Sequence, residues 1–102
     1  MPNLQPAVDV ISAMSNDKRL LVLSILTTAG ELSVSELAKR VGLAQNALSH
    51  HLSILRHVKL VSTRREQQTI YYSCDAAVSE KVRQMVEAAH VIGSERYPYP
   101  RP

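Results

Sequence analysis

The chain has 102 residues, of which 45% are hydrophobic and 21% charged, and its formal net charge is +3. This size and composition are typical of a single soluble globular domain. No apolar stretch approaches the roughly 18 residues of a membrane span, the N-terminus lacks the features of a signal peptide, and one cysteine excludes an intrachain disulfide, so we expect a cytoplasmic protein with no membrane partner.

Two helices are predicted in the first third of the chain. Residues 7–14 form a short helix with an apolar face. A second helix over residues 17–29 begins after Asn16, a residue type that caps helix N-termini, and ends at Gly30. Because apolar residues surround this second helix almost completely, we expect it to be central and buried.

A helix, a tight turn and another helix follow. Ser33 and Glu36 have the spacing of a capping box, so a third helix begins near Val34. Gly42 allows the left-handed backbone of a tight turn, and a fourth helix runs over residues 45–57. This arrangement is typical of a helix-turn-helix.

The fourth helix has an apolar and a polar face. The apolar stripe consists of Leu48, Leu52 and Leu55, which follow i, i+4, i+7 spacing. The opposite face carries amides, hydroxyls and an imidazole, which suit the edges of base pairs better than an ordinary Glu/Lys surface does. We therefore predict a recognition helix for the DNA major groove, with an ordinary polar face as the alternative. Its base-reading candidates are Gln45, Asn46, Ser49 and His50.

Residues 60–74 have the pattern of a β-hairpin with a basic tip, which we interpret as a wing. Arg64 and Arg65, assisted by Gln67, are expected to contact phosphates or the minor groove, unless the tip is merely exposed. Further phosphate candidates are Ser35, through its backbone N–H, and the basic side chains of Lys39, Arg56, Lys18 and Arg19.

The basic residues are concentrated in this part of the chain. Residues 37–74 contain six basic residues and one acidic residue, a net charge of +5, whereas the rest of the chain has a net charge of −2. A solvated positive face would explain the charge alone. Its coincidence with the polar face of the fourth helix favours a nucleic-acid partner.

A last helix is predicted over residues 76–91, and its single apolar stripe can close the core or pair with a partner subunit. The Pro-rich residues 93–102 are expected to form a flexible tail, so the folded domain is predicted over residues 1–92. Three side chains between the motifs are given structural roles: His51 as a packed, hydrogen-bonded residue, Cys74 as a buried thiol, and one of the two neighbouring tyrosines as a core residue.

The order helix, helix, helix-turn-helix, β-hairpin, helix resembles the ArsR (SmtB/ArsR) family of bacterial winged-helix repressors, and looks closest to its NolR/HlyU-like branch. The resemblance covers roughly residues 8–90 and rests on four segments, residues 13–20, 31–37, 43–52 and 60–72. It implies a mainly α fold with a small β-hairpin, α-α-α-α-β-β-α, and a homodimer that binds an imperfect palindrome in double-stranded DNA. It also places the first and last helices in the dimer interface, with Val10, Ile11, Met14, Val78, Val82, Met85, Val86 and Ala89 as the contacting residues.

The chain departs from the family at its known sensor sites. Hydroxyls at Ser33 and Ser35 stand where metal-sensing members carry cysteines, and hydroxyls are poor ligands for soft metals. The zinc site between the terminal helices lacks its ligands, and redox-sensing members use two cysteines. Lys59 stands where the family often has Gly or Asn, and costs roughly 1 kcal/mol if its backbone is left-handed.

We therefore predict a DNA-binding repressor with no metal, no cofactor and no enzymatic activity. Two alternatives stay open: a ligand- or redox-gated sensor of the same family, and a winged-helix module that binds proteins. The second alternative would require an apolar outer face on the fourth helix, which the sequence does not have.

Overall fold

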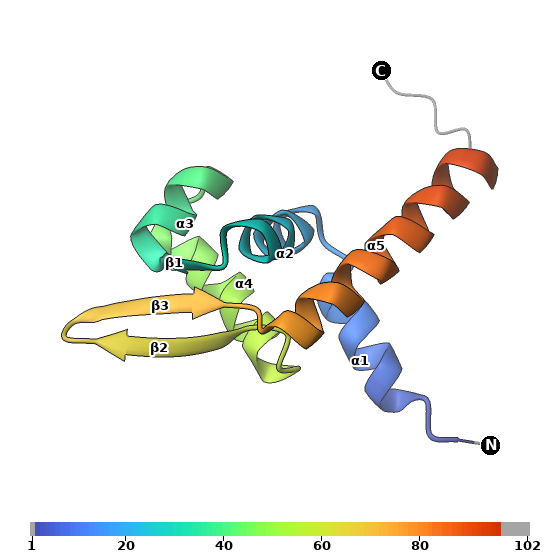
Figure 1. Ribbon diagram of the computed structural model, residues 1–102, viewed down its shortest axis with the longest axis horizontal. Helices are drawn as coiled ribbons and strands as arrows, with labels where there is room; N and C mark the ends of the chain where they lie inside the picture. The colour runs from blue at the N-terminus through green and yellow to red at the C-terminus, as the bar shows by residue number, and fades with distance from the viewer. Residues whose placement is uncertain (1, 97–102) are drawn as a thin grey trace.

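The computed structural model describes residues 2–96 and shows a mainly helical chain with one small antiparallel sheet (Figure 1). The elements in chain order are α1 (Gln5–Met14), α2 (Asp17–Ala29), β1 (Glu31–Ser33), α3 (Val34–Val41), α4 (Gln45–His57), β2 (Ser62–Glu66), β3 (Thr69–Ser73) and α5 (Ala76–Arg96). The predicted winged helix-turn-helix is confirmed, with one strand more than the sequence predicted.

The starts of α2 and α3 follow from local capping. Asn16 Oδ1 accepts hydrogen bonds from the backbone N–H groups of Lys18 and Arg19 at 2.9 and 3.1 Å, and so caps α2. Ser33 Oγ accepts from the Glu36 N–H at 3.2 Å and caps α3. The Glu36 carboxylate accepts from the Ser33 hydroxyl at 3.2 Å, not from the backbone N–H that a capping box uses.

The additional strand β1 joins the hairpin and makes a three-stranded sheet in the order β1-β3-β2. Both outer strands run antiparallel to β3, with Ser33 and Arg64 opposite Tyr71 from either side. Since side chains alternate along a strand, Leu32 and Tyr72 lie on the opposite face from Tyr71, and they pack on the core. The tight end of the hairpin is Gln67, whose φ is 55°.

The core lies between α2, α3, α4 and the inner face of the sheet. Its fully buried large side chains are Val22, Leu23, Leu26, Leu37, Leu48, Leu52 and Leu55. The prediction that α2 is central and buried is confirmed for Val22, Leu23 and Leu26 but is wrong for Leu20 and Leu21, which are 37% and 39% exposed. Leu20 faces the groove between α1 and α5, which is open in a single chain.

The last helix, α5, is longer than predicted and extends away from the body of the domain (Figure 1). Residues 93–96, which were predicted to belong to the flexible tail, are instead the last turn of α5, which runs to Arg96. The rest of the predicted tail, residues 97–102, lies outside the described residues.

Candidate DNA-binding surface

The turn between α3 and α4 is made by Gly42, as predicted. Its φ of 77° and ψ of 36° are left-handed, and its N–H donates to the Ala38 carbonyl at 2.9 Å. The Leu43 N–H donates to the same carbonyl at 3.1 Å. These bonds end α3 tightly, so α4 begins three residues after the turn and packs against α3, α2 and α1.

The two faces of α4 are separated as the sequence predicted. Leu48, Leu52 and Leu55 are each 0% exposed. The polar side is exposed along its whole length and consists of Gln45, Asn46, Ser49, His50 and Ser53. Because the leucines fix the rotation of the helix in the core, this row of hydrogen-bonding side chains faces outward in one orientation.

The wing presents Arg65 and Gln67 at its end. Arg65 is exposed, and its Nε donates to the Gln67 carbonyl at 3.1 Å, which holds the arginine against the turn. Gln67 is exposed in the turn itself, at φ 55°. Since Arg65 and Arg64 are neighbours on one strand, their side chains leave the sheet on opposite faces.

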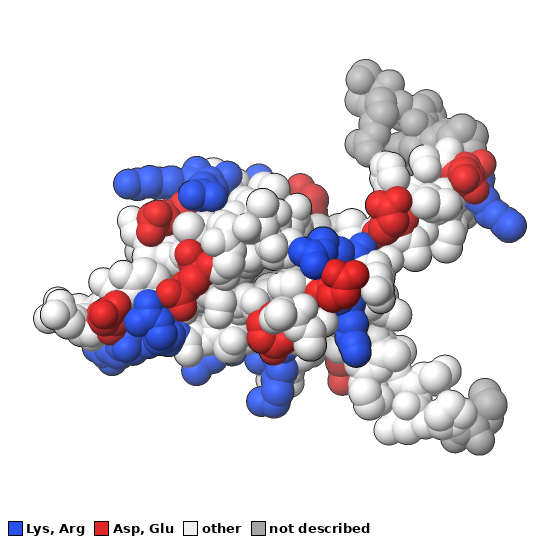
Figure 2. Space-filling model, in the orientation of Figure 1, with Lys and Arg blue, Asp and Glu red and all other residues white. Residues whose placement is uncertain are grey.

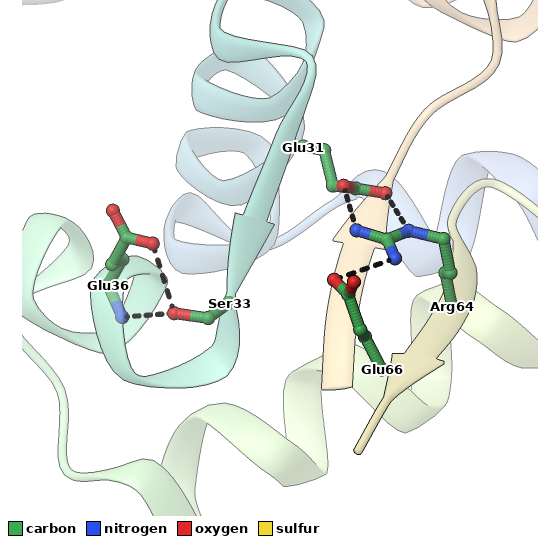
Figure 3. Close-up of polar contacts among 5 residues, drawn as sticks. All are labelled: Glu31, Ser33, Glu36, Arg64 and Glu66. Carbon is green, nitrogen blue, oxygen red and sulfur yellow. Dashed lines mark hydrogen bonds and ion pairs between the residues drawn. The ribbon is translucent and has the colours of Figure 1, made fainter. Parts of the chain in front are cut away.

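Arg64 is held by carboxylates, which the sequence did not predict. Its Nε and Nη2 donate to the two Glu31 carboxylate oxygens at 3.1 and 2.8 Å, and its Nη1 donates to Glu66 Oε2 at 3.2 Å (Figure 3). The hydrogen bond from Arg64 lowers the pKa of Glu31, and the bonds to Glu31 and then Glu66 raise the pKa of Arg64. The guanidinium is therefore engaged, which argues against the expected phosphate contact at this residue.

Three more phosphate candidates, Ser35, Lys39 and Arg56, are exposed. Lys39 lies in the last turn of α3 beside Arg40, a basic residue that was not among the predicted contacts. Arg40 could have been predicted from the sequence, because it directly follows Lys39. Figure 2 shows Lys and Arg side chains at α3 and along the hairpin, with acidic side chains interspersed, and further Lys and Arg side chains along α5.

Arg19 and His51 connect α2 and α4. Arg19 Nε donates to the Ala13 carbonyl at 2.5 Å, and Nη1 lies 3.1 Å from His51 Nδ1. An arginine can only donate, so His51 accepts with an unprotonated Nδ1. Burial, with the nearby Arg19 cation, lowers the pKa of His51. His51 is thus packed and hydrogen-bonded as predicted, while Arg19 is engaged inside the protein and is a poor phosphate candidate.

Cys74 is buried where β3 leads into α5. Its Sγ donates to the Leu60 carbonyl at 3.3 Å, which links the two ends of the wing. Burial, together with the Asp75 carboxylate, raises the pKa of the thiol to about 11. A thiol with so high a pKa is a weak nucleophile near neutral pH, in keeping with the predicted structural role.

The expected interface residues on α1 and α5 fall into two groups. Met14 and Val82 are buried within the chain and need no partner to be covered, whereas Val10 and Val78 are half-buried against the core. The exposed group borders an apolar cleft of about 670 Å³ between α1, Leu20 of α2 and α5. Its members from the predicted interface are Ile11, Met85, Val86 and Ala89.

Residues 2–96 offer neither a metal site nor a membrane span. No group of three or more His, Cys, Asp or Glu side chains in this range is placed to hold a metal ion. Among the helices described, none combines the length and the hydropathy that a membrane crossing requires.

Comparison with known proteins gives a consistent result. Residues 16–63 match the model of the arsR family of bacterial regulatory proteins. Nodulation protein NolR of Rhizobium meliloti is 53% identical over 76 residues, which cover 74% of this chain and 62% of NolR. The transcriptional activator HlyU of Vibrio cholerae is 44% identical over 88 residues, which cover 86% of this chain and 78% of HlyU. The chain therefore spans less than two thirds of NolR but most of HlyU.

A solved structure agrees with the fold over nearly the whole chain. The homodimeric winged helix-turn-helix DNA-binding domain Mb0332 from Mycobacterium bovis superposes with a TM-score of 0.78 at 26% identity, covering 96% of this chain and 90% of that one. The family model matches a segment that includes the turn at Gly42 and all of α4. The alignment with HlyU is longer than this segment and extends over 88 residues. The chain belongs to the arsR family of bacterial regulatory proteins.

Proposed function

We propose that the protein is a homodimeric repressor that binds double-stranded DNA in the bacterial cytoplasm. The observation that carries the proposal is the division of α4, in which a fully buried leucine stripe holds an exposed row of amide, hydroxyl and imidazole groups. Such a helix fits the major groove, whose base edges present donors and acceptors to these side chains. The mechanism is binding alone and includes no catalytic step.

The proposed contacts fall into base-reading and backbone groups. Gln45, Asn46, Ser49 and His50 read base edges from α4. Arg65 and Gln67 of the wing reach phosphates or the minor groove beside it, and the α3 residues Ser35, Lys39 and Arg40, with Arg56 of α4, hold the flanking backbone. All of these residues are exposed, which is what contact with DNA requires.

The dimer is proposed to form through the cleft between α1 and α5. Ile11, Met85 and Val86 are 61%, 37% and 41% exposed, which leaves an apolar surface that a second copy would cover. The relative Mb0332 is described as homodimeric, which supports the same arrangement here. A twofold dimer would place its two recognition helices about one turn of duplex apart, roughly 34–36 Å.

The proposal is tested by selecting bound duplexes from a random pool with the purified protein. We expect a twofold-related pair of half-sites with centres about 10–10.5 base pairs apart. Placing the selected site across a promoter before a reporter gene should lower expression when the protein is present. Failure to enrich any sequence, or enrichment of single half-sites only, would contradict the proposal.

The role of the wing is tested by the salt dependence of binding. Arg65→Ala should weaken binding to all duplexes and reduce the slope of log K against log salt by about 0.9 for each phosphate that the protein no longer neutralises. Arg83→Ala on α5 is the matched control, because it removes the same charge away from the proposed surface. Equal slopes for the Arg65 variant and the control would remove Arg65 from the interface.

A further inference from the structure

Arg64 connects the two outer strands of the sheet. Because the strand order is β1-β3-β2, the backbone hydrogen bonds of β1 and β2 go to β3 and not to each other. The bidentate bond from Arg64 on β2 to Glu31 on β1, at 2.8 and 3.1 Å, is a direct connection between them across the central strand (Figure 3).

The guanidinium of Arg64 is fixed from several sides. Glu31 binds two of its nitrogens and Glu66 binds the third at 3.2 Å. Below it lies Tyr71 of the central strand, with the Arg64 Cζ 4.6 Å from the ring centroid. Bidentate pairing and stacking on a ring both use the flat, forked shape of a guanidinium, which a lysine ammonium does not have.

The strand that Arg64 reaches leads straight into the helix-turn-helix. Strand β1 ends at Ser33, the residue that caps α3, and Glu31 lies two residues before this cap. A bond between Glu31 and the wing therefore joins the wing to the first helix of the DNA-binding unit. Within the described residues, this is the one ion pair that joins two different elements of the fold.

We propose that Arg64 is a positioning residue that holds the wing in place relative to the helix-turn-helix and does not contact phosphate. The inference rests on the proposed function, because it assigns a role within DNA binding. The charges support it: one cation between two carboxylates leaves a net negative group at this point of the sheet. Three of the five N–H donors of Arg64 already bond carboxylates, and a phosphate would have to approach the remaining two against both negative charges. Arg65, on the other face, has no carboxylate partner among the described residues.

Three substitutions separate positioning from phosphate contact. Arg64→Gln removes the charge and the fork, Arg64→Lys keeps the charge and removes the fork, and Glu31→Gln frees Arg64 from its main partner. Glu80→Gln on α5 is the control for loss of one negative charge far from the wing. Each variant is assayed by gel shift over a range of salt concentrations, with a duplex carrying the selected half-sites, after circular dichroism has shown that it is folded.

If Arg64 positions the wing, all three variants should bind about two- to fivefold more weakly than the wild type, the size expected when an exposed ion pair is broken. The slope of log K against log salt should stay unchanged in each. The double variant Arg64→Gln/Glu31→Gln should bind no more weakly than either single variant, because both remove the same bond.

A phosphate contact gives the opposite pattern and would overturn the inference. Arg64→Lys would then bind like the wild type, Arg64→Gln would lower the salt slope, and Glu31→Gln would bind more tightly than the Glu80→Gln control. These results would leave DNA binding intact and remove only the role given to Arg64. If the wild-type protein binds no duplex at all, the proposed function itself fails.

Discussion

The two ends of the molecule treat their apolar side chains differently. Within α3 and α4 the chain buries its own leucines completely, and the large side chains that α4 exposes are polar. Along α1 and α5 the same kind of amphipathic pattern leaves Ile11, Met85 and Val86 exposed. We infer that the proposed DNA-binding end is complete in one chain, whereas the end formed by α1 and α5 is complete only with a second copy.

The largest effect is expected at the incomplete end. Met85→Asp should prevent dimerisation, because a carboxylate would be buried in an apolar interface. Losing the second half-site should weaken binding to the selected site on the order of 10²–10⁴-fold. Sedimentation equilibrium and gel shift measure the two effects. Ile70→Asp, at an apolar residue exposed on the wing, should leave the sedimentation unchanged, and a dimeric Met85→Asp protein would show that this end is not the interface.

The next effect tests whether the other end really is packed within one chain. Leu52→Ala should lower the free energy of unfolding by about 2–5 kcal/mol, because it opens a cavity in the core beneath α4. Ser53→Ala, at the exposed neighbour, should change it by less than about 0.5 kcal/mol. Urea unfolding at one fixed protein concentration measures both. Equal stabilities for the two variants would show that α4 is not anchored by its leucines.

The predictability of the fold differs between local and distant interactions. Asn16, Ser33 and Gly42 act on their own helix ends, so the sequence predicts the starts of α2 and α3 and the turn before α4. Strand β1 has three residues with no alternation long enough to detect, and it is a strand only because it pairs with β3. Its existence therefore depends on residues far along the chain.

The candidate site follows the same rule. The exposed face of α4 is predicted directly by its periodicity, and the structure agrees. Arg64 and Arg65 are indistinguishable in the sequence, because the partner that separates them, Glu31, lies 33 positions earlier. Likewise, Met14 and Ile11 share one predicted stripe, and only the packing shows that the first is buried and the second exposed.

A smaller effect is expected at Lys59, which joins α4 to the wing. Its φ of 63° is left-handed, a conformation that is costly for a residue with a side chain. Lys59→Gly should therefore stabilise the protein by about 0.5–1 kcal/mol, after the greater entropy of glycine in the unfolded chain is subtracted. Lys81→Gly, inside α5, should instead destabilise it by about 1 kcal/mol. Thermal unfolding of both variants shows whether the packed end stores strain at this residue.

The smallest effect concerns His51, at the junction of the two ends, where Arg19 bonds both α1 and α4. Burial and the Arg19 cation lower the pKa of His51 below its ordinary 6.5, so the unfolded chain takes up a proton before the folded one does. Stability should therefore fall as the pH drops below about 6.5. His51→Gln keeps an acceptor for Arg19 but cannot take up a proton. The loss of stability that protonation of His51 causes should therefore be absent in this variant. Identical pH profiles for the two proteins would show that the contact is not coupled to folding.

The proposed function depends on base reading by the exposed face of α4. A comparison of the base preferences of the wild type and two variants tests this directly. Binding of the wild type, Gln45→Ala and Gln84→Ala is measured on the selected site and on each of its single-base variants. We expect Gln45→Ala to lose about 1–3 kcal/mol of discrimination at one or two base pairs, with the preference elsewhere kept. The α5 variant Gln84→Ala should keep the full pattern. A Gln45→Ala protein with wild-type affinity and base preference at every position would contradict base reading by α4.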